Sequence, residues 1–228
     1  MYERVHLLCE NYRTACASFS FSVDTTQEDI EFERARSKRE DLLLNAPIRD
    51  YPDSYLEALA VYRRIAERMP DFDTVLMHGS CIAVDGTAYL FTAKSGTGKS
   101  THARLWRERF GDRAVMVNDD KPLIRITEHG AIAYGTPWDG KHRLSSNIAV
   151  PLKAVCILER AEHNSIRRIA ANEAYPMLLQ QIYRPLEPDT TAKTLALIDR
   201  LTASVGLYRL GCNMEPEAAD VSYEAMKG

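Results

Sequence analysis

The residues with the clearest chemical potential lie between Ala93 and Ser100, where the sequence reads AKSGTGKS. The general phosphate-binding loop has the pattern G-x-x-x-x-G-K-[S/T], of which only the first glycine is missing here. Two glycines would let the backbone approach phosphate groups, the lysine supplies a cation, and the serine supplies a hydroxyl for Mg²⁺. The residues expected to bind a nucleotide are therefore Ser95, Gly96, Thr97, Gly98, Lys99, Ser100 and Thr101.

The sequence on either side of this loop fits a nucleotide site. The apolar run AYLFTA directly precedes the loop and is typical of a buried strand. A helix is expected to follow it, and the N-terminus of a helix favours anions. The alternative is a Gly/Ser turn that binds nothing, but such turns seldom combine a preceding strand with Gly-Lys-Ser at the start of a helix.

The acidic pair Asp119-Asp120 follows the apolar run AVMV. Ligand sites of open α/β sheets gather at the carboxyl ends of strands. Phosphoryl transfer needs a carboxylate for the metal and a group that orients or deprotonates the acceptor hydroxyl. Adjacent strand residues point to opposite faces, so both aspartates can serve one site only if the strand ends or twists there. A turn closed by Asp-Asp-Lys-Pro is the structural alternative.

His78 precedes Gly79 at the end of the apolar run TVLM. A lone histidine beside a glycine is more often structural than catalytic, so this residue is a candidate only in company with others. The remaining histidines show neither H-x-x-x-H nor H-E-x-x-H spacing, which argues against a histidine metal site.

The segment GTPWDGKHR, residues 135–143, has the composition of a functional loop. Lys141 and Arg143 are candidates to neutralise charge on a transferring phosphate. Trp138 is a candidate to line an acceptor or nucleotide pocket, and Asp139 completes the expected substrate-binding set. The alternative is a structural turn with a packed tryptophan and solvated cations.

The rest of the chain alternates strand and helix patterns. Strands are expected at SFSFSV, on both sides of the hairpin signal Asp85-Gly86, and at RAVMVN, PLIRIT, AVCILER, SIRRIA and GLYRL. Helices are expected at DSYLEALAVYRRIAERM, ANEAYPMLLQQIY, DTTAKTLALIDRLTAS and PEAADVSYEAM. The charge-dense run EFERARSKREDLLL is interpreted as a solvated helix face. We expect one α/β domain over residues 1–228, with a P-loop core at 74–228 and residues 1–73 as an integral extension.

Composition excludes several classes of protein. The net charge of −3 and the lack of a Lys/Arg-dense face argue against a nucleic-acid partner. The five scattered cysteines never form C-x-x-C, which argues against a disulfide framework or a structural zinc site. The start MYERVHLLCENYRT lacks a signal peptide's apolar region, and no apolar run reaches the roughly 18 residues of a membrane span. A cytoplasmic protein without a membrane partner is expected.

Three features together resemble the catalytic domain of HPr kinase/phosphorylase. They are the Ser-Gly-x-Gly-Lys-Ser loop, the upstream pair His78-Gly79, and the pair Asp119-Asp120 after the loop helix. The loop also looks like that of ATP-dependent phosphoenolpyruvate carboxykinase. The resemblance covers roughly residues 74–160 and implies an HPr kinase/phosphoenolpyruvate carboxykinase-like fold with a mixed β-sheet and flanking helices.

The resemblance also implies roles for these residues. Lys99 and the loop amides would hold the β- and γ-phosphates of ATP, Ser100 and one aspartate would hold Mg²⁺, and the other aspartate would act as base. Asp119 is favoured as the base and Asp120 as the metal ligand. His78 would lie beside the pair, tuning it or contacting phosphate.

Two departures separate this chain from HPr kinase/phosphorylase. Thr101 stands where that family has a glutamate, and YGTPWDGKHRLSSN stands in place of its arginine- and glycine-rich signature. The chain looks most like the small HPr-kinase-related proteins beside bacterial peptide-modification systems, some of which phosphorylate a precursor peptide in lasso-peptide biosynthesis.

The expected function is ATP-dependent transfer of phosphate to a serine or other hydroxyl of a protein or peptide. The alternatives are an ATP-binding regulatory module without turnover and a carboxykinase-like enzyme that acts on a small carboxylate. Self-association of the chain is left open.

Overall fold

The computed structural model describes residues 3–16, 18–43, 45–140 and 142–228. The chain divides into two units, Met1–Arg68 and Met69–Gly228. The expectation that residues 1–73 are integral to the core stays a prediction. None of the helices in these ranges combines the length and the apolar character that a transmembrane segment needs.

The first unit is helical where the structure describes it. It contains α1 (Glu3–Leu8), η1 (Glu10–Tyr12), α2 (Gln27–Leu43) and α3 (Asp53–Arg68). The charge-dense run lies in α2 and is mostly exposed, as expected of a solvated helix face, but Asp29, Glu33 and Asp41 of this helix are buried. Arg63 of α3 donates to Asp29 at 2.7 Å and to Glu33 at 2.6 Å. These buried carboxylates are tolerated because they are paired.

The prediction of a strand at SFSFSV is wrong. Residues 18–23 form no strand, and Phe19 within them is 79% exposed. A strand is stable only when its backbone groups pair with a neighbour, and the described part of this unit offers helices alone. Alternation of polar and apolar residues was therefore not sufficient to predict a strand.

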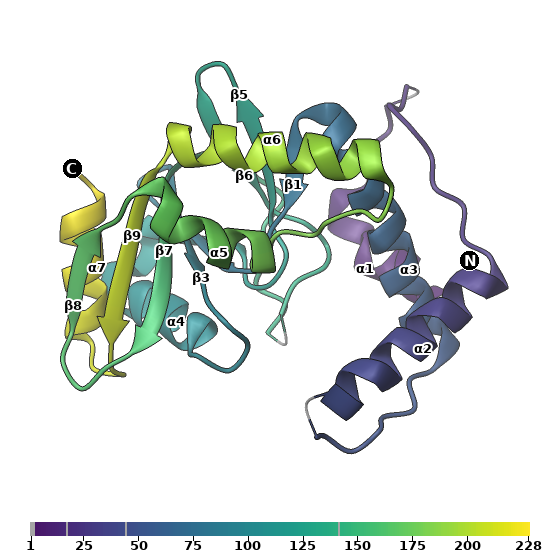
Figure 1. The fold of residues 1–228 in the computed structure, drawn as a ribbon, viewed down its shortest axis with the longest axis horizontal. Helices are drawn as coiled ribbons and strands as arrows, with labels where there is room; N and C mark the ends of the chain where they lie inside the picture. The colour runs from purple at the N-terminus through teal and green to yellow at the C-terminus, as the bar shows by residue number, and fades with distance from the viewer. Residues whose placement is uncertain (1–2, 17, 44, 141) are drawn as a thin grey trace. The chain divides into compact units, whose positions relative to one another are not determined.

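The second unit is built on one mixed sheet (Figure 1). Its strands are β1 (Thr74–Leu76), β2 (Ser80–Val84), β3 (Thr87–Thr92), β4 (Ala114–Asn118), β5 (Leu123–Thr127), β6 (Gly130–Tyr134), β7 (Ala149–Arg160), β8 (Ser165–Arg168) and β9 (Gly206–Cys212). The order is β1-β5-β6-β7-β3-β2-β4, with β9 paired to β7 and β8 paired to β9. β3 and β9 run parallel to β7, whereas the other pairs are antiparallel.

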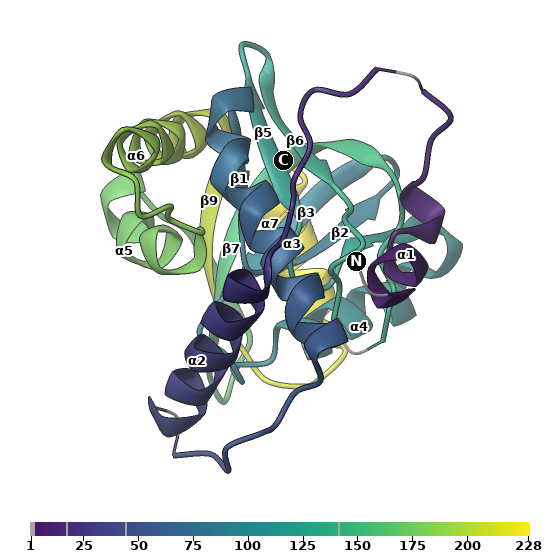
Figure 2. The ribbon, with the colours of Figure 1, turned by 90° about the vertical axis from the view of Figure 1, so that its right-hand side faces the viewer.

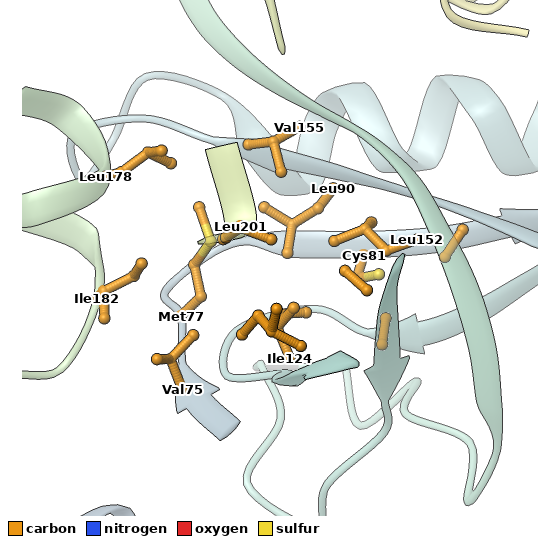
Figure 3. Packing of buried hydrophobic residues seen from close by; sticks show 14 of the residues in the cluster. Val75, Met77, Cys81, Leu90, Ile124, Leu152, Val155, Leu178, Ile182 and Leu201 are labelled. Atoms are coloured by element: carbon orange, nitrogen blue, oxygen red, sulfur yellow. The ribbon is translucent and has the colours of Figure 1, made fainter. Parts of the chain in front are cut away.

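Helices cover both faces of this sheet. α4 (Lys99–Phe110) and α7 (Glu217–Met226) pack on one face, and α5 (Ala171–Gln181) and α6 (Pro188–Ser204) pack on the other (Figure 2). Alternation along β7 divides its side chains between the two cores, because successive strand residues point to opposite faces. Val155 and Ile157 join the α5 and α6 core, part of which Figure 3 shows, and Cys156 and Leu158 join the α4 and α7 core.

Tight turns lead into several of the strands. Asp85 and Gly86 have φ of 51° and 76° and connect β2 to β3, so the predicted hairpin is confirmed. Short 3₁₀ turns at η2 (Met69–Phe72) and η3 (Gly111–Arg113) lead into β1 and β4. The expected α/β class with a mixed sheet and flanking helices is confirmed.

Candidate active site

The candidate phosphate-binding loop connects β3 to α4, as expected from its pattern. Gly96 and Gly98 have φ of 78° and 123°, which residues with a β-carbon rarely adopt. Ala93 is buried and does not have a positive φ, so the first position of the loop does not require glycine. α4 begins at Lys99, and the first N–H groups of a helix have no partner within it. The loop therefore leads into a ready anion site.

Lys99 lies at the base of this loop. Its side chain is buried, and Nζ donates to the carbonyl of Ala93 at 3.1 Å. Burial lowers the pKa of Lys99, while the negative charges of Asp120 and Asp119 oppose that shift. Both aspartates therefore favour the charged form of Lys99. Ser100, the next residue, is exposed.

The acidic pair lies where β4 ends. Oδ1 of Asn118 accepts hydrogen bonds from the backbone N–H groups of Asp120 at 2.8 Å and Lys121 at 2.6 Å. This turn, built by an Asn side chain on its own backbone, terminates the strand. The condition under which two adjacent aspartates can serve one site is therefore met.

Asp119 is the more enclosed member of the pair. It is 8% exposed, and its Oδ1 accepts a hydrogen bond of 2.6 Å from Oγ of the buried Ser80. A β-carbon on Gly140 would lie 3.1 Å from Oδ2, so the absence of a side chain there leaves space beside that oxygen. One carboxylate oxygen is fixed by Ser80, and the other faces this space.

Asp120 is paired with His78. The His78 Nε2 atom lies 3.4 Å from Asp120 Oδ1, and Lys121 Nζ lies 3.6 Å from Oδ2. On the other side of the ring, Nδ1 lies 2.8 Å from Oε1 of Gln181, the last residue of α5. Since an amide oxygen can only accept, Nδ1 carries the proton, and Nε2 is left to face the carboxylate.

The surroundings of His78 favour its neutral form. Burial is the main cause that lowers its pKa, and Lys99 and Lys121 lower it further, while Asp120 and Gln181 oppose them. A neutral Nε2 lone pair beside a carboxylate can share one proton with it. The pair can therefore accept a proton from a hydroxyl group brought next to it.

The loop after β6 adjoins the end of β4. The Asn118 amide nitrogen donates to the carbonyl and the hydroxyl of Thr136 at 3.1 and 3.0 Å. Asp139 accepts from the hydroxyl of Ser145 at 2.9 Å and so braces its own loop. Trp138 is partly exposed and Arg143 exposed, whereas Lys141 lies outside the described residues.

The sequence did not point to Ser80, Asn118 or Gln181. Asn118 carried a usable signal, because Asn at the end of a strand often closes a turn. Gln181 is 103 residues from His78, and no local pattern links them.

Within the described ranges, no group of three or more His, Cys, Asp or Glu side chains is placed to hold a metal. A hydroxyl and one or two carboxylates still fit Mg²⁺, which takes its other ligands from water and phosphate.

Two comparisons with known proteins give a match. A structure of the HPr(Ser) kinase/phosphatase from Coxiella burnetii matches 67% of this chain and 99% of its own, with 10% identity and a TM-score of 0.37. No curated protein sequence matches the chain. The family of the SynChlorMet cassette protein ScmC matches residues 53–185, which is more than half of the 228 residues. The chain belongs to the ScmC family of SynChlorMet cassette proteins.

Proposed function

We propose that this protein is an ATP- and Mg²⁺-dependent phosphotransferase that acts on a hydroxyl group of a protein or peptide. The observation that carries the proposal is the placement of His78 Nε2 at 3.4 Å from Asp120 Oδ1. The charges of Asp120 and Asp119 also raise the pKa of the buried Lys99, against the larger effect of burial. A module that only senses a nucleotide needs the loop and the lysine but no acid–base pair. The pair therefore favours turnover.

The phosphate loop supplies nucleotide binding. Lys99 and the amides of residues 95–101 would hold the β- and γ-phosphates, at the end of α4 where the helix dipole is positive. The buried position of Lys99 strengthens its attraction for phosphate, because a charge removed from water is screened less.

Ser100 and Asp119 are the residues best suited to Mg²⁺. Both offer hard oxygen ligands, which this ion prefers. Asp119 has one oxygen oriented by Ser80 and the other beside the space that Gly140 leaves. Hydrogen bonds of this kind hold a ligating carboxylate in place. When bound, the ion would neutralise charge on the phosphates.

Asp120 is the residue best suited to act as base, which reverses the expected assignment of the two aspartates. It is the more exposed of the two, so an acceptor hydroxyl can reach it. His78 lies beside its carboxylate and can share the proton that the hydroxyl gives up. Lys121 also lies next to this carboxylate, and two basic neighbours make it less suited to a divalent cation than Asp119.

The acceptor is proposed to be a serine-containing peptide or protein. The ScmC family is described as part of a cassette, so another product of that cassette is the first candidate. This choice agrees with the resemblance to kinases of peptide-modification systems. Trp138, Arg143 and Lys141 belong to the loop that would meet the acceptor.

Mass spectrometry tests the proposal directly. The protein is incubated with ATP, Mg²⁺ and each candidate cassette peptide, and a mass increase of about 80 Da, one phosphoryl group, is expected on a serine. The same peptide with that serine changed to alanine is the control. ATP binding without turnover for any hydroxyl acceptor would contradict the proposal and favour a regulatory module. Turnover with a small carboxylate alone would favour the carboxykinase-like alternative.

A further inference from the structure

Arg160 is the last residue of β7 and lies beside the phosphate-binding loop. β7 runs parallel to β3, with Ile157 opposite Thr92, so its last three residues extend past the end of β3. On its other side Arg160 is paired with Cys212 of β9. The backbone of Arg160 is therefore held by the sheet up to the end of the strand.

The side chain of Arg160 points to the face that carries the loop helix. Cys156 and Leu158 belong to the core beneath α4 and α7, and side chains two residues apart share one face of a strand. Arg160 continues that series. Glu159 points the other way and pairs with Arg209, which in turn contacts Glu173 of α5. The alternation of side chains along β7 therefore directs the guanidinium of Arg160 toward the loop.

The guanidinium of Arg160 binds the loop backbone at two points. Its Nη2 donates to the carbonyl of Gly96 at 2.5 Å, and its Nε donates to the carbonyl of Thr97 at 3.4 Å. Among the described residues, no other side chain donates to a carbonyl of residues 94–98. At the start of the loop, Lys99 donates to the carbonyl of Ala93.

These two contacts fix the direction of the loop amides. In a trans peptide the C=O and the N–H point in opposite directions. The carbonyl of Thr97 shares a peptide with the N–H of Gly98, so holding the carbonyl turns that N–H away from the guanidinium. The carbonyl of Gly96 shares a peptide with the N–H of Thr97, which donates to Lys94 at 3.3 Å. Both ends of that second peptide are therefore fixed.

We propose that Arg160 is a positioning residue that holds the phosphate-binding loop in a receptive form before the nucleotide arrives. This inference rests on the proposed function, because it assigns phosphate binding to the same loop. Preorganisation lowers the cost of ordering the loop on binding. The planar fork of arginine reaches two carbonyls at once, whereas lysine offers the same charge as a single point.

The experiment uses the full chain and four variants. The variants are Arg160→Ala, Arg160→Lys, Lys99→Ala and, as a matched control, Arg168→Ala, which removes an exposed arginine from β8. Backbone ¹⁵N order parameters of Thr97 and Gly98 are measured without nucleotide. ADP affinity is then measured by calorimetry. Circular dichroism checks that each variant is folded.

The expected result is that both Arg160 variants lower the two order parameters and weaken ADP binding about tenfold, the order expected for losing a hydrogen bond to a charged group. Arg168→Ala should match the wild type. Unchanged order parameters in Arg160→Ala would overturn the inference. Wild-type ADP affinity in Arg160→Lys would also overturn it, because charge alone would then account for the effect.

The two proposals fail in different ways. If the wild type binds ADP and Arg160→Ala leaves both measurements unchanged, the positioning role is wrong and the proposed function stands. If the wild type binds no ADP, or Lys99→Ala binds it as tightly, the proposed function is wrong. Positioning of the loop backbone by Arg160 is then judged from the order parameters alone.

Discussion

Nε2 of His78 lies 3.4 Å from Oδ1 of Asp120. The two residues are also joined through their backbones, because the N–H of Gly79 donates to the carbonyl of Asp120 at 3.0 Å. The His78 N–H donates to the Gln181 carbonyl at 2.8 Å, so the histidine is held on both sides. A pair fixed in this way keeps its geometry when either side chain is replaced by one of similar size. Substitutions can therefore separate binding from transfer.

Lys99→Ala is expected to abolish nucleotide binding. The change removes the buried cation at the base of the phosphate loop and leaves the loop backbone intact. Calorimetric titration with ATP checks it, with Lys38→Ala as control because Lys38 is an exposed lysine of α2. Tight binding of ATP by Lys99→Ala would refute the assignment of the loop.

Asp120→Asn is expected to keep nucleotide affinity and to lose transfer by at least about a hundredfold, the low end of the range for a general base. The amide keeps the size of the carboxylate but cannot accept the proton. Asp119→Asn is the matched comparison, and it should instead raise the Mg²⁺ concentration needed for activity. Single-turnover rates across a Mg²⁺ titration check both. The reverse pattern would return the role of base to Asp119.

Gly140→Ala is expected to weaken the response to Mg²⁺. The new β-carbon would lie 3.1 Å from Oδ2 of Asp119 and would fill the space beside it. The backbone of Gly140 does not have a positive φ, so alanine adds no backbone strain. Half-activation by Mg²⁺ is compared with Gly228→Ala, where nothing lies within 4 Å. Equal values would show that this space is not needed for the ion.

Local sequence patterns were enough to predict the strand, the loop and the helix around Lys99. The strand, loop and helix around Lys99 are consecutive, so hydrophobic periodicity and the positions of two glycines determine them. The acidic pair was predicted at a strand end for the same reason. The hairpin at Asp85-Gly86 followed from its turn residues alone.

Partners that are distant in the sequence could not be predicted in this way. Gln181 reaches His78 because residues after α5 pair with residues after β1, as in the bridge between Met77 and Ile182. That contact depends on the order of the whole sheet. The strand predicted at SFSFSV failed for a related reason, since a strand also needs a partner that the local pattern does not reveal.

Arg63→Met is expected to destabilise the first unit by up to about 3 kcal/mol, since it removes the buried partner of two buried carboxylates. Asp29 would keep the partly exposed Arg64, and Glu33 would keep the half-exposed Arg36. Burial raises the pKa of Asp29, but hydrogen bonds from Arg63 and Thr26 outweigh it and bring the value to about 2. Urea unfolding checks the change. Arg36→Met, which removes a half-exposed partner of Glu33, should cost much less. Equal losses would show that burial of the pair is unimportant.

His102 is expected to make the protein less stable in mild acid. It is a buried residue of α4, its Nε2 lies 3.1 Å from Ser222 Oγ, and its Nδ1 has no partner among the described residues. Burial lowers its pKa to about 4. An unfolded chain with an ordinary histidine pKa of about 6.5 therefore binds more protons between these values. By linkage, stability is intact above about pH 6.5 and falls as the pH drops toward about 4.

The loss should be about 2 kcal/mol between about pH 7.5 and about pH 5. Urea unfolding at the two pH values checks this for the wild type and for His102→Leu, which has no group to protonate. The variant should lose that part of the pH dependence even if it is less stable at both values. His129→Leu, which replaces an exposed histidine, should keep the wild-type slope. If His102→Leu keeps the same slope, the acid sensitivity arises elsewhere and the neutral, buried state of His102 is not its cause.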